Sequence, residues 1–117
     1  MKENLIAQKT LDFAIKIVKL NDFLLNEKKE FILAKQILRS GTSIGANCAE
    51  SAYAISKKDF INKFFIALKE ASETRYWLIL LNATKKIEVG VYEELLSDCE
   101  EIIKIITRIV KTAQENQ

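Results

Sequence analysis

The chain has 117 residues, of which 49% are hydrophobic and 29% are charged, with a formal net charge of +2 at pH 7. This length suits one domain with its own core, and the hydrophobic content excludes an intrinsically disordered chain. There is no proline, no histidine and only three glycines, so the composition favours helices and lacks the commonest general base and metal ligand.

The two cysteines, Cys48 and Cys99, are far apart in the sequence and form no CxxC pair. We interpret them as reduced, buried, small apolar residues. The first residues carry scattered charges and lack the apolar segment of a signal peptide. The longest uncharged run, Ser40–Ala49, is far shorter than the roughly 18 apolar residues of a membrane helix. We therefore expect a cytoplasmic protein that does not contact a membrane.

The first predicted helix runs from about Glu3 to Leu25. Its apolar residues recur at helical spacing and predict one face: Ala7, Leu11, Ala14, Val18 and Leu25. At about 100° per residue, however, eight of its apolar side chains cover roughly 220° of the circumference: Ile6, Ala7, Leu11, Phe13, Ile15, Ile17, Val18 and Leu20. A monomeric bundle needs about half of that arc, so we expect part of the helix to face another subunit.

Asn26 is the candidate N-cap of a second helix, which runs from about Glu27 to Ala54. Its inner side is predicted to carry small and apolar residues: Ala34, Leu38, Gly41, Ile44, Cys48 and Ala52. Gly41 and Gly45 lie four residues apart within helical periodicity, without the strand and the spacing of a phosphate-binding loop. Because glycine costs about 1 kcal/mol in a helix interior, we interpret Gly41, Gly45 and Ala49 as a strip that a neighbouring helix approaches closely. A ligand groove is the alternative.

A third helix begins at Ser56 with a pattern similar to a capping box and runs to about Ala83. Its predicted buried positions are Phe60, Phe64, Ala67, Ala71, Leu78 and Leu81. A fourth helix, from about Val91 to Ala113, has a seam of Leu95, Cys99, Ile102, Ile106, Ile109 and Ala113. Long helices joined by short turns predict an all-α fold, an antiparallel up-down-up-down four-helix bundle with residues 1–117 as a single domain.

Polar side chains fall within one narrow arc of the second helix: Gln36, Arg39, Ser43, Asn47 and Glu50. Glu70 and Glu73 share one side of the third helix. If the two helices are antiparallel about a turn near Ser56, the numbers of facing residues sum to about 112. That register pairs Arg39 with Glu73 or Glu70, Ser43 with Lys69 or Glu70, and Glu50 with Asn62 or Lys63. We interpret the set as a structural polar ladder, because buried charges are usually paired.

The carboxylates of Glu50, Glu70 and Glu73 fit neither a metal site nor the active site of a glycosidase. A di-iron bundle needs Glu-x-x-His on two helices, and this chain has no histidine. Paired carboxylates that cleave sugars need a substrate cleft, which a narrow bundle does not offer. We therefore predict no enzyme activity, no catalytic residue, no metal and no cofactor.

The segment "QILRSGTSIGANCAESAYAISKKDFINKFFIALKEASETRYWLILL", residues 36–81, resembles the four-helix-bundle proteins encoded by intervening sequences in bacterial 23S rRNA genes. The matching positions are Gln36, Arg39, Ser40, Ser43, Ile44, Asn47, Glu50, Asp59, Phe60, Ala67, Glu70, Glu73, Trp77 and Leu78. The segment is also similar to the accessory protein of diversity-generating retroelements. These resemblances imply a homopentameric barrel of bundles with a basic surface that contacts nucleic acid and a reverse transcriptase.

Two helices carry more apolar surface than one bundle buries, which predicts a homo-oligomer. The candidate interface residues are Phe13, Ile17 and Leu20 on the first helix and Phe65 and Tyr76 on the third. The two helices are diagonal in a simple bundle, so their patches lie on opposite sides and favour a heterologous, ring-closing contact over a two-fold dimer. The residues do not give the number of subunits; five is what the resemblance implies.

Charge is segregated along the last helix. From Glu88 to Glu101 there are six acidic residues and no basic one, and Lys104, Arg108 and Lys111 follow. Lys2, Lys9 and Lys16 repeat by seven on the first helix. Antiparallel pairing of the two helices is expected to bring the two basic stripes together at one end, as a patch that contacts phosphates. Solvated helix faces are the alternative, and no aromatic residue lies among these lysines to indicate base stacking.

These observations leave two functional hypotheses. The first is a non-enzymatic, ring-forming helical bundle that binds RNA or DNA non-specifically through its basic end. The second is an oligomeric protein-interaction scaffold, for example for a reverse transcriptase, without direct nucleic-acid binding. Binding that weakens as salt rises would separate them, since contacts between cations and phosphates depend on ionic strength.

Overall fold

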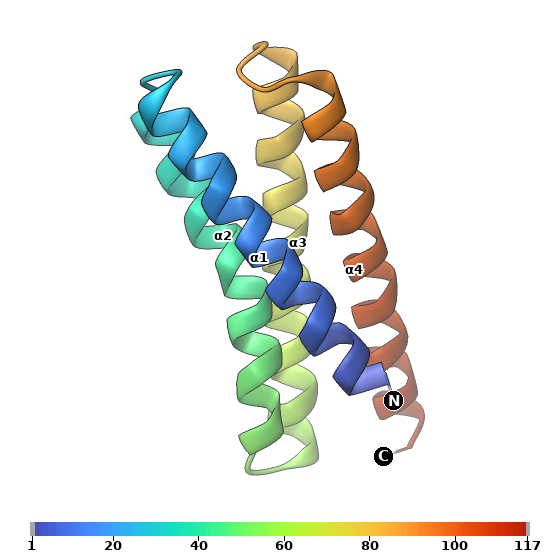
Figure 1. Cartoon of the computed structure of the whole chain (residues 1–117). Coiled ribbons are helices and arrows are strands. Elements are labelled where there is room, and N and C mark those ends of the chain that lie inside the picture. The colour runs from blue at the N-terminus through green and yellow to red at the C-terminus, as the bar shows by residue number, and fades with distance from the viewer. Residues whose placement is uncertain (1, 117) are drawn as a thin grey trace.

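The computed structural model describes residues 2–116, and their side chains from residue 5 on. Four α-helices follow one another: α1 (Lys2–Asn26), α2 (Phe31–Glu50), α3 (Lys57–Ala83) and α4 (Val89–Glu115), with a short 3₁₀ turn, η1 (Ser51–Tyr53), after α2. Figure 1 shows them running alternately up and down, with both termini and the α2–α3 turn at one end. α1 packs against α2 and α4, and α3 packs against the same two helices. The predicted all-α antiparallel bundle is confirmed.

The start and end of α2 differ from the prediction. Lys29 has a φ of 53°, a left-handed conformation that interrupts helical hydrogen bonding, so Asn26 ends α1 and does not cap α2. The N-cap is Glu30, whose Oε2 accepts a hydrogen bond of 3.1 Å from the Leu33 N–H. α2 ends at Glu50 because the chain tightens into η1 and then extends at Ala54, where ψ is 138°.

The start of α3 is as predicted. The Ser56 hydroxyl accepts a hydrogen bond of 3.0 Å from the Asp59 N–H, which satisfies one of the unpaired donors at a helix N-terminus. The Asp59 carboxylate in turn accepts one of 3.2 Å from the Ile55 N–H. Two side chains therefore fix the path of the chain into α3.

The core contains the predicted seams of the last two helices. All six seam residues of α4 are buried, and so are the predicted positions of α3 except Phe60, which is partly buried. α1 differs, because the face predicted from Ala7, Leu11 and Val18 is exposed. Its buried side is formed by Ile6, Thr10, Phe13, Ile17, Leu20 and Leu24. The apolar arc of α1 is wide enough for two faces, and periodicity alone did not identify the one that packs inside.

The glycines of α2 explain which face of α1 turns inward. A Cβ atom on Gly41 would lie 2.9 Å from Ile17 Cγ1, and one on Gly45 would lie 3.2 Å from Thr10 Cβ. Distances this short show that α1 approaches the backbone of α2 where side chains are missing, as in other close-packed interiors. The predicted close approach is confirmed at these two glycines, whereas Ala49 is exposed.

Both cysteines are free and buried, as predicted. Burial raises the pKa of the Cys48 thiol and of the Cys99 thiol to about 12, so neither is a thiolate near neutral pH. Within residues 2–116, no helix is long and apolar enough to cross a membrane. The described side chains also include no group of three or more acidic, cysteine or histidine residues placed to hold a metal ion.

Candidate functional site

The polar contact between α2 and α3 centres on Arg39. Its Nη1 donates to Glu70 Oε2 at 3.1 Å, and its Nη2 contacts Glu73. Glu73 also accepts a hydrogen bond of 2.9 Å from the Trp77 indole N–H. This bond and the Arg39 guanidinium lower the pKa of Glu73. The Arg39 side chain is 49% exposed, so the cluster is a surface ion-pair network worth about 1 kcal/mol or less per pair.

The rest of the ladder connects the helices less than predicted. Lys63 Nζ reaches Glu50 Oε1 at 2.9 Å, one of the two partners that the register allowed. Ser43 and Asn47 instead donate to backbone carbonyls of α2 itself, those of Arg39 and Ser43. Gln36 lies half-buried on the same helix. Within the predicted ladder, Arg39 and Glu50 therefore connect α2 to α3, whereas Ser43 and Asn47 bond within α2.

A buried polar contact between α2 and α3 was missed by sequence reasoning. The Thr74 and Ser40 hydroxyls are hydrogen-bonded at 2.8 Å, Thr74 Oγ1 also lies 2.8 Å from the Glu70 carbonyl oxygen, and Thr74 and Ser40 are fully buried. Thr74 stands between Ala71 and Leu78 in an otherwise apolar seam, which was the available signal. This pair favours one facing of the two helices, because a slip would leave the buried Ser40 hydroxyl without Thr74, whereas Thr74 would keep its bond to the Glu70 carbonyl.

The lysines of α1 do not form the predicted basic stripe. Lys9 Nζ lies 2.7 Å from Glu101 Oε1, and Lys16 Nζ lies 2.8 Å from Asp98 Oδ2 and 3.1 Å from Glu94 Oε2. The hydrogen bond to Asp98, followed by that to Glu94, raises the pKa of Lys16. The antiparallel register places the acidic part of α4 beside these lysines, so opposite charges meet. The side chain of Lys2 lies outside the described residues.

The second basic stripe is different. Lys104, Arg108 and Lys111 are all exposed in the C-terminal half of α4, and none of them forms an ion pair with another described side chain. The acidic residues that precede this stripe are engaged elsewhere, since Glu101 pairs with Lys9 and Glu100 with Arg75 at 3.0 Å, while Glu115 follows Lys111 by four residues. The candidate phosphate-binding surface is thus confined to α4. We call Lys104, Arg108 and Lys111 the α4 basic surface.

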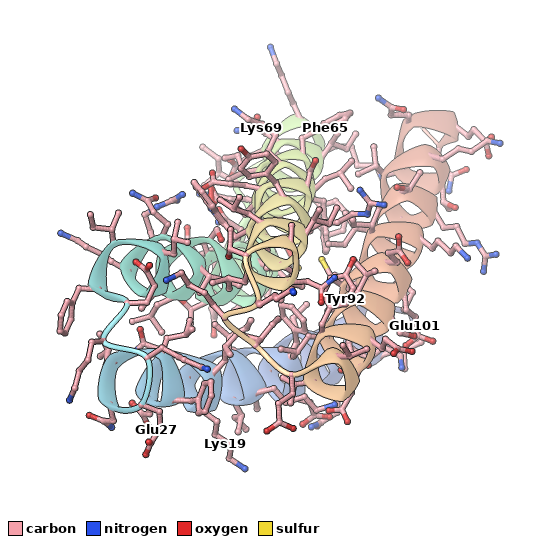
Figure 2. All side chains as sticks on the ribbon, turned by 90° about the horizontal axis from the view of Figure 1, so that it is seen from above. Lys19, Glu27, Phe65, Lys69, Tyr92 and Glu101 are labelled. Atoms are coloured by element: carbon pink, nitrogen blue, oxygen red, sulfur yellow. The ribbon has the colours of Figure 1, made fainter. Side chains whose placement is uncertain are left out.

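The predicted interface residues fall into two groups. Phe13, Ile17 and Leu20 are 1%, 0% and 5% exposed and belong to the core, so the prediction that they face another subunit is wrong. The exposed apolar residues of α1 are instead Leu5, Leu11, Ile15 and Val18. Phe65 and Tyr76 are exposed on α3 together with Ile79. Figure 2 shows Phe65 on the outer side of α3, beside Lys69 and away from the other helices.

An apolar groove between α1 and the start of α4 was not predicted. Its volume is about 530 Å³, with apolar side chains on its floor and charged ones at its edge. It is lined by Lys16, Lys19, Leu20, Phe23, Ile87, Glu88, Gly90, Val91, Glu94 and Leu95. The groove depends on how far the two helices diverge, which the sequence of neither helix specifies.

The comparisons with known proteins agree with this architecture. A model of the 23S rRNA-intervening sequence protein family matches residues 2–108. The chain belongs to this family. The match covers the Arg39 cluster and two of the three α4 basic residues, Lys104 and Arg108, and it ends before Lys111.

A solved structure of the same kind extends the comparison. It is a protein with unknown function from the S23 ribosomal protein family of Bacteroides thetaiotaomicron VPI-5482, with a TM-score of 0.93 and 55% sequence identity. The match covers 95% of this chain and 99% of that one. Comparison with curated protein sequences finds no match. The family match and the structural match therefore agree on both family and fold. No catalytic activity is known for this family.

Several titratable groups of the described residues are buried or paired. The thiols are buried with raised pKa values, and Glu50, Glu70 and Glu73 each contact a cation. The exposed groups without an ion-pair partner among the described residues include the three cations of the α4 basic surface, and exposed apolar residues lie on α1, on α3 and in the α2–α3 turn. Such groups bind polyanions and other proteins.

Proposed function

We propose that this chain is a non-enzymatic, ring-forming bundle that binds RNA or DNA non-specifically through the α4 basic surface. The observation that carries the proposal is the exposure of Lys104, Arg108 and Lys111 without an ion-pair partner among the described residues. Cationic side chains that meet phosphates position a nucleic acid without reading its sequence. The proposal places this interaction in the bacterial cytoplasm.

Assembly is part of the proposal, because three cations per chain form a weak binding surface alone. Each phosphate neutralised contributes about 0.7 to 0.9 to the slope of log affinity against log salt, so one chain supplies a slope of about 2 to 3. The exposed apolar residues of α1 and α3 lie on diagonal helices and favour a heterologous contact that closes a ring. A homopentamer, which the resemblance implies, would repeat the α4 basic surface around the ring.

A salt titration of RNA and DNA binding tests the proposal. The variant Lys104/Arg108/Lys111→Glu is expected to lose nearly all affinity and most of the salt slope. The matched control, Lys19/Lys28/Lys35→Glu, makes the same change in charge at exposed lysines nearer the other end of the bundle and is expected to retain most of the affinity. Equal losses from the two variants would contradict a localised surface. Light scattering measures the molar mass of the parent and of both variants. A parent that is monomeric at micromolar concentration would contradict the proposed ring.

The second candidate, an interaction scaffold for a protein such as a reverse transcriptase, is favoured by one observation. The groove of about 530 Å³ between α1 and α4 has an apolar floor of Leu20, Phe23, Val91 and Leu95, of the kind in which a helix of another protein packs. A parent protein that shows no salt-sensitive binding to nucleic acid would put this candidate first.

A further inference from the structure

The turn between α2 and α3 displays the two most exposed large apolar side chains of the described chain. Tyr53 is 87% exposed and Ile55 is 93% exposed. Both lie at the end of the bundle where the chain passes from η1 into α3. The apolar residues proposed to close a ring lie along the sides of α1 and α3, so that contact leaves this end of the bundle uncovered.

The backbone that presents these side chains is fixed by hydrogen bonds. The Ser51 hydroxyl donates to the Cys48 carbonyl at 2.6 Å, and the Ala54 N–H donates to the Ser51 carbonyl at 3.2 Å. The Ile55 N–H donates to the Asp59 carboxylate, which completes the cap of α3. A rigid turn loses little conformational entropy when it binds a partner. The exposure of Tyr53 is thus a property of the fold.

The charges around the turn favour an anionic partner. Lys57 and Lys58 follow the two apolar residues directly and are exposed, and neither forms an ion pair with another described side chain. The two carboxylates beside the turn are engaged, since Asp59 accepts from the Ile55 N–H and Glu50 pairs with Lys63 at 2.9 Å. The C-terminal end of α4, with Arg108 and Lys111, lies at the same end of the bundle (Figure 1).

We propose that Tyr53 is a base-stacking platform for single-stranded nucleic acid, whose phosphates contact Lys57 and Lys58 and continue onto the α4 basic surface. The inference rests on the proposed function and names the class of nucleic acid. No aromatic residue lies between Lys104 and Lys111 in α4, and this turn supplies one. Stacking on an aromatic ring tolerates any base, because every base has a π-face. A duplex hides those faces, so single strands are the preferred ligand.

The shape of the basic surface favours a flexible strand over an anionic membrane. Lys104 lies 11 residues before the last residue of α4, which is about 16 Å along the helix at about 1.5 Å per residue. A flat bilayer that touched Tyr53 and Ile55 at the tip would leave Lys104 far from its surface. A single strand bends, so it reaches both the tip and the side of α4.

The test uses fluorescence anisotropy with a labelled oligothymidylate and a labelled DNA hairpin of equal charge, on the full-length parent. Tyr53→Ala is expected to weaken oligothymidylate binding between about five-fold and about a hundred-fold, with little change for the hairpin. Tyr53→Phe keeps the ring and is expected to bind like the parent. The matched control is Phe31→Ala, which removes an exposed aromatic side chain at the other end of the bundle and is expected to have no effect.

The outcomes separate this inference from the function on which it rests. If Tyr53→Ala binds oligothymidylate like the parent while Lys104/Arg108/Lys111→Glu has lost binding, the stacking platform is overturned and the proposed function stands. If the parent binds neither nucleic acid, the proposed function fails and the platform with it. If Tyr53→Ala and Ile55→Ala abolish binding to phosphatidylserine vesicles but leave oligothymidylate affinity unchanged, the turn docks on membranes and the inference is wrong.

Discussion

α1 contacts its two neighbours by different physical means. Towards α2 it approaches so closely that Ile17 fills the space above Gly41, where a Cβ atom would lie only 2.9 Å away. Towards α4 it is joined by Lys9 and Lys16, which pair with acidic residues at the surface, and beyond them the helices part around a groove of about 530 Å³. The side of α1 towards α2 is therefore a close apolar contact, whereas the side towards α4 combines apolar residues such as Leu20 and Leu95 with ion pairs at the surface.

This difference predicts which contact of α1 can change its geometry more easily. Close-packed contacts do not deform without loss of stability, so the α1–α2 contact is expected to be the fixed part of the fold. Exposed ion pairs contribute little and are screened by salt. The α1–α4 contact is thus the side on which a partner or a change of conditions alters the structure at low cost.

The largest expected effect comes from truncating a buried side chain at the α1–α2 contact. Ile17→Ala is expected to lower the free energy of unfolding by about 2–5 kcal/mol, because Ile17 is fully buried. Ile15→Ala is the control, since Ile15 lies on the exposed face of the same helix and is expected to cost less than about 0.5 kcal/mol. Denaturant unfolding, at a protein concentration low enough to dissociate any oligomer, measures both. Equal losses would show that the two faces of α1 have been misassigned.

A smaller effect is expected from adding one methyl group to the same contact. Gly41→Ala places a Cβ atom 2.9 Å from Ile17 and is expected to cost about 1–2 kcal/mol net, since overpacking outweighs the gain in helix propensity. Gly90→Ala, in the first turn of α4, meets nothing within 4 Å and is expected to be neutral or slightly stabilising. Thermal unfolding of both variants checks the comparison. A stabilised Gly41→Ala protein would mean that α1 moves away readily, and the packed side would no longer be the rigid one.

The smallest effect is expected on the charged side, where it depends on pH. Because Asp98 and Glu94 raise the pKa of Lys16 above its ordinary 10.5, this pairing stabilises the fold fully below pH 10.5 and is lost as pH rises through the folded value. Lys16→Met is expected to lower the free energy of unfolding by less than about 1 kcal/mol near neutral pH. As the pH rises above 10.5, the variant is expected to lose less stability than the parent, because it has no pairing left to lose. Lys19→Met, at an exposed lysine of the same helix, controls for removal of a charge. A cost above about 2 kcal/mol would place the pairing among buried interactions.

The ion pairs between α1 and α4 show what the sequence could not predict. The lysine spacing on α1 and the acidic run on α4 are both visible in the sequence, but the sequence did not show that the two face each other. Whether Lys9 is available to a phosphate depends on the residue opposite it, and Glu101 lies 92 residues away along the chain. The α2–α3 register was easier to predict, because a short turn fixes which residues face each other: Arg39 and Glu73 lie equally far from it.

Local sequence patterns were enough to predict four helices and the seams of α3 and α4, because both follow from periodicity. The cap at Ser56 follows from capping chemistry, and the close approach at Gly41 and Gly45 follows from the absence of side chains there. The tertiary structure alone decided which face of α1 is buried and which cations remain unpaired. Phe13 and Leu11 are both apolar residues on the same helix, and only the position of α2 and α4 places one inside and the other outside. Burial and charge pairing depend on neighbours distant in sequence, and no local pattern records where those neighbours lie.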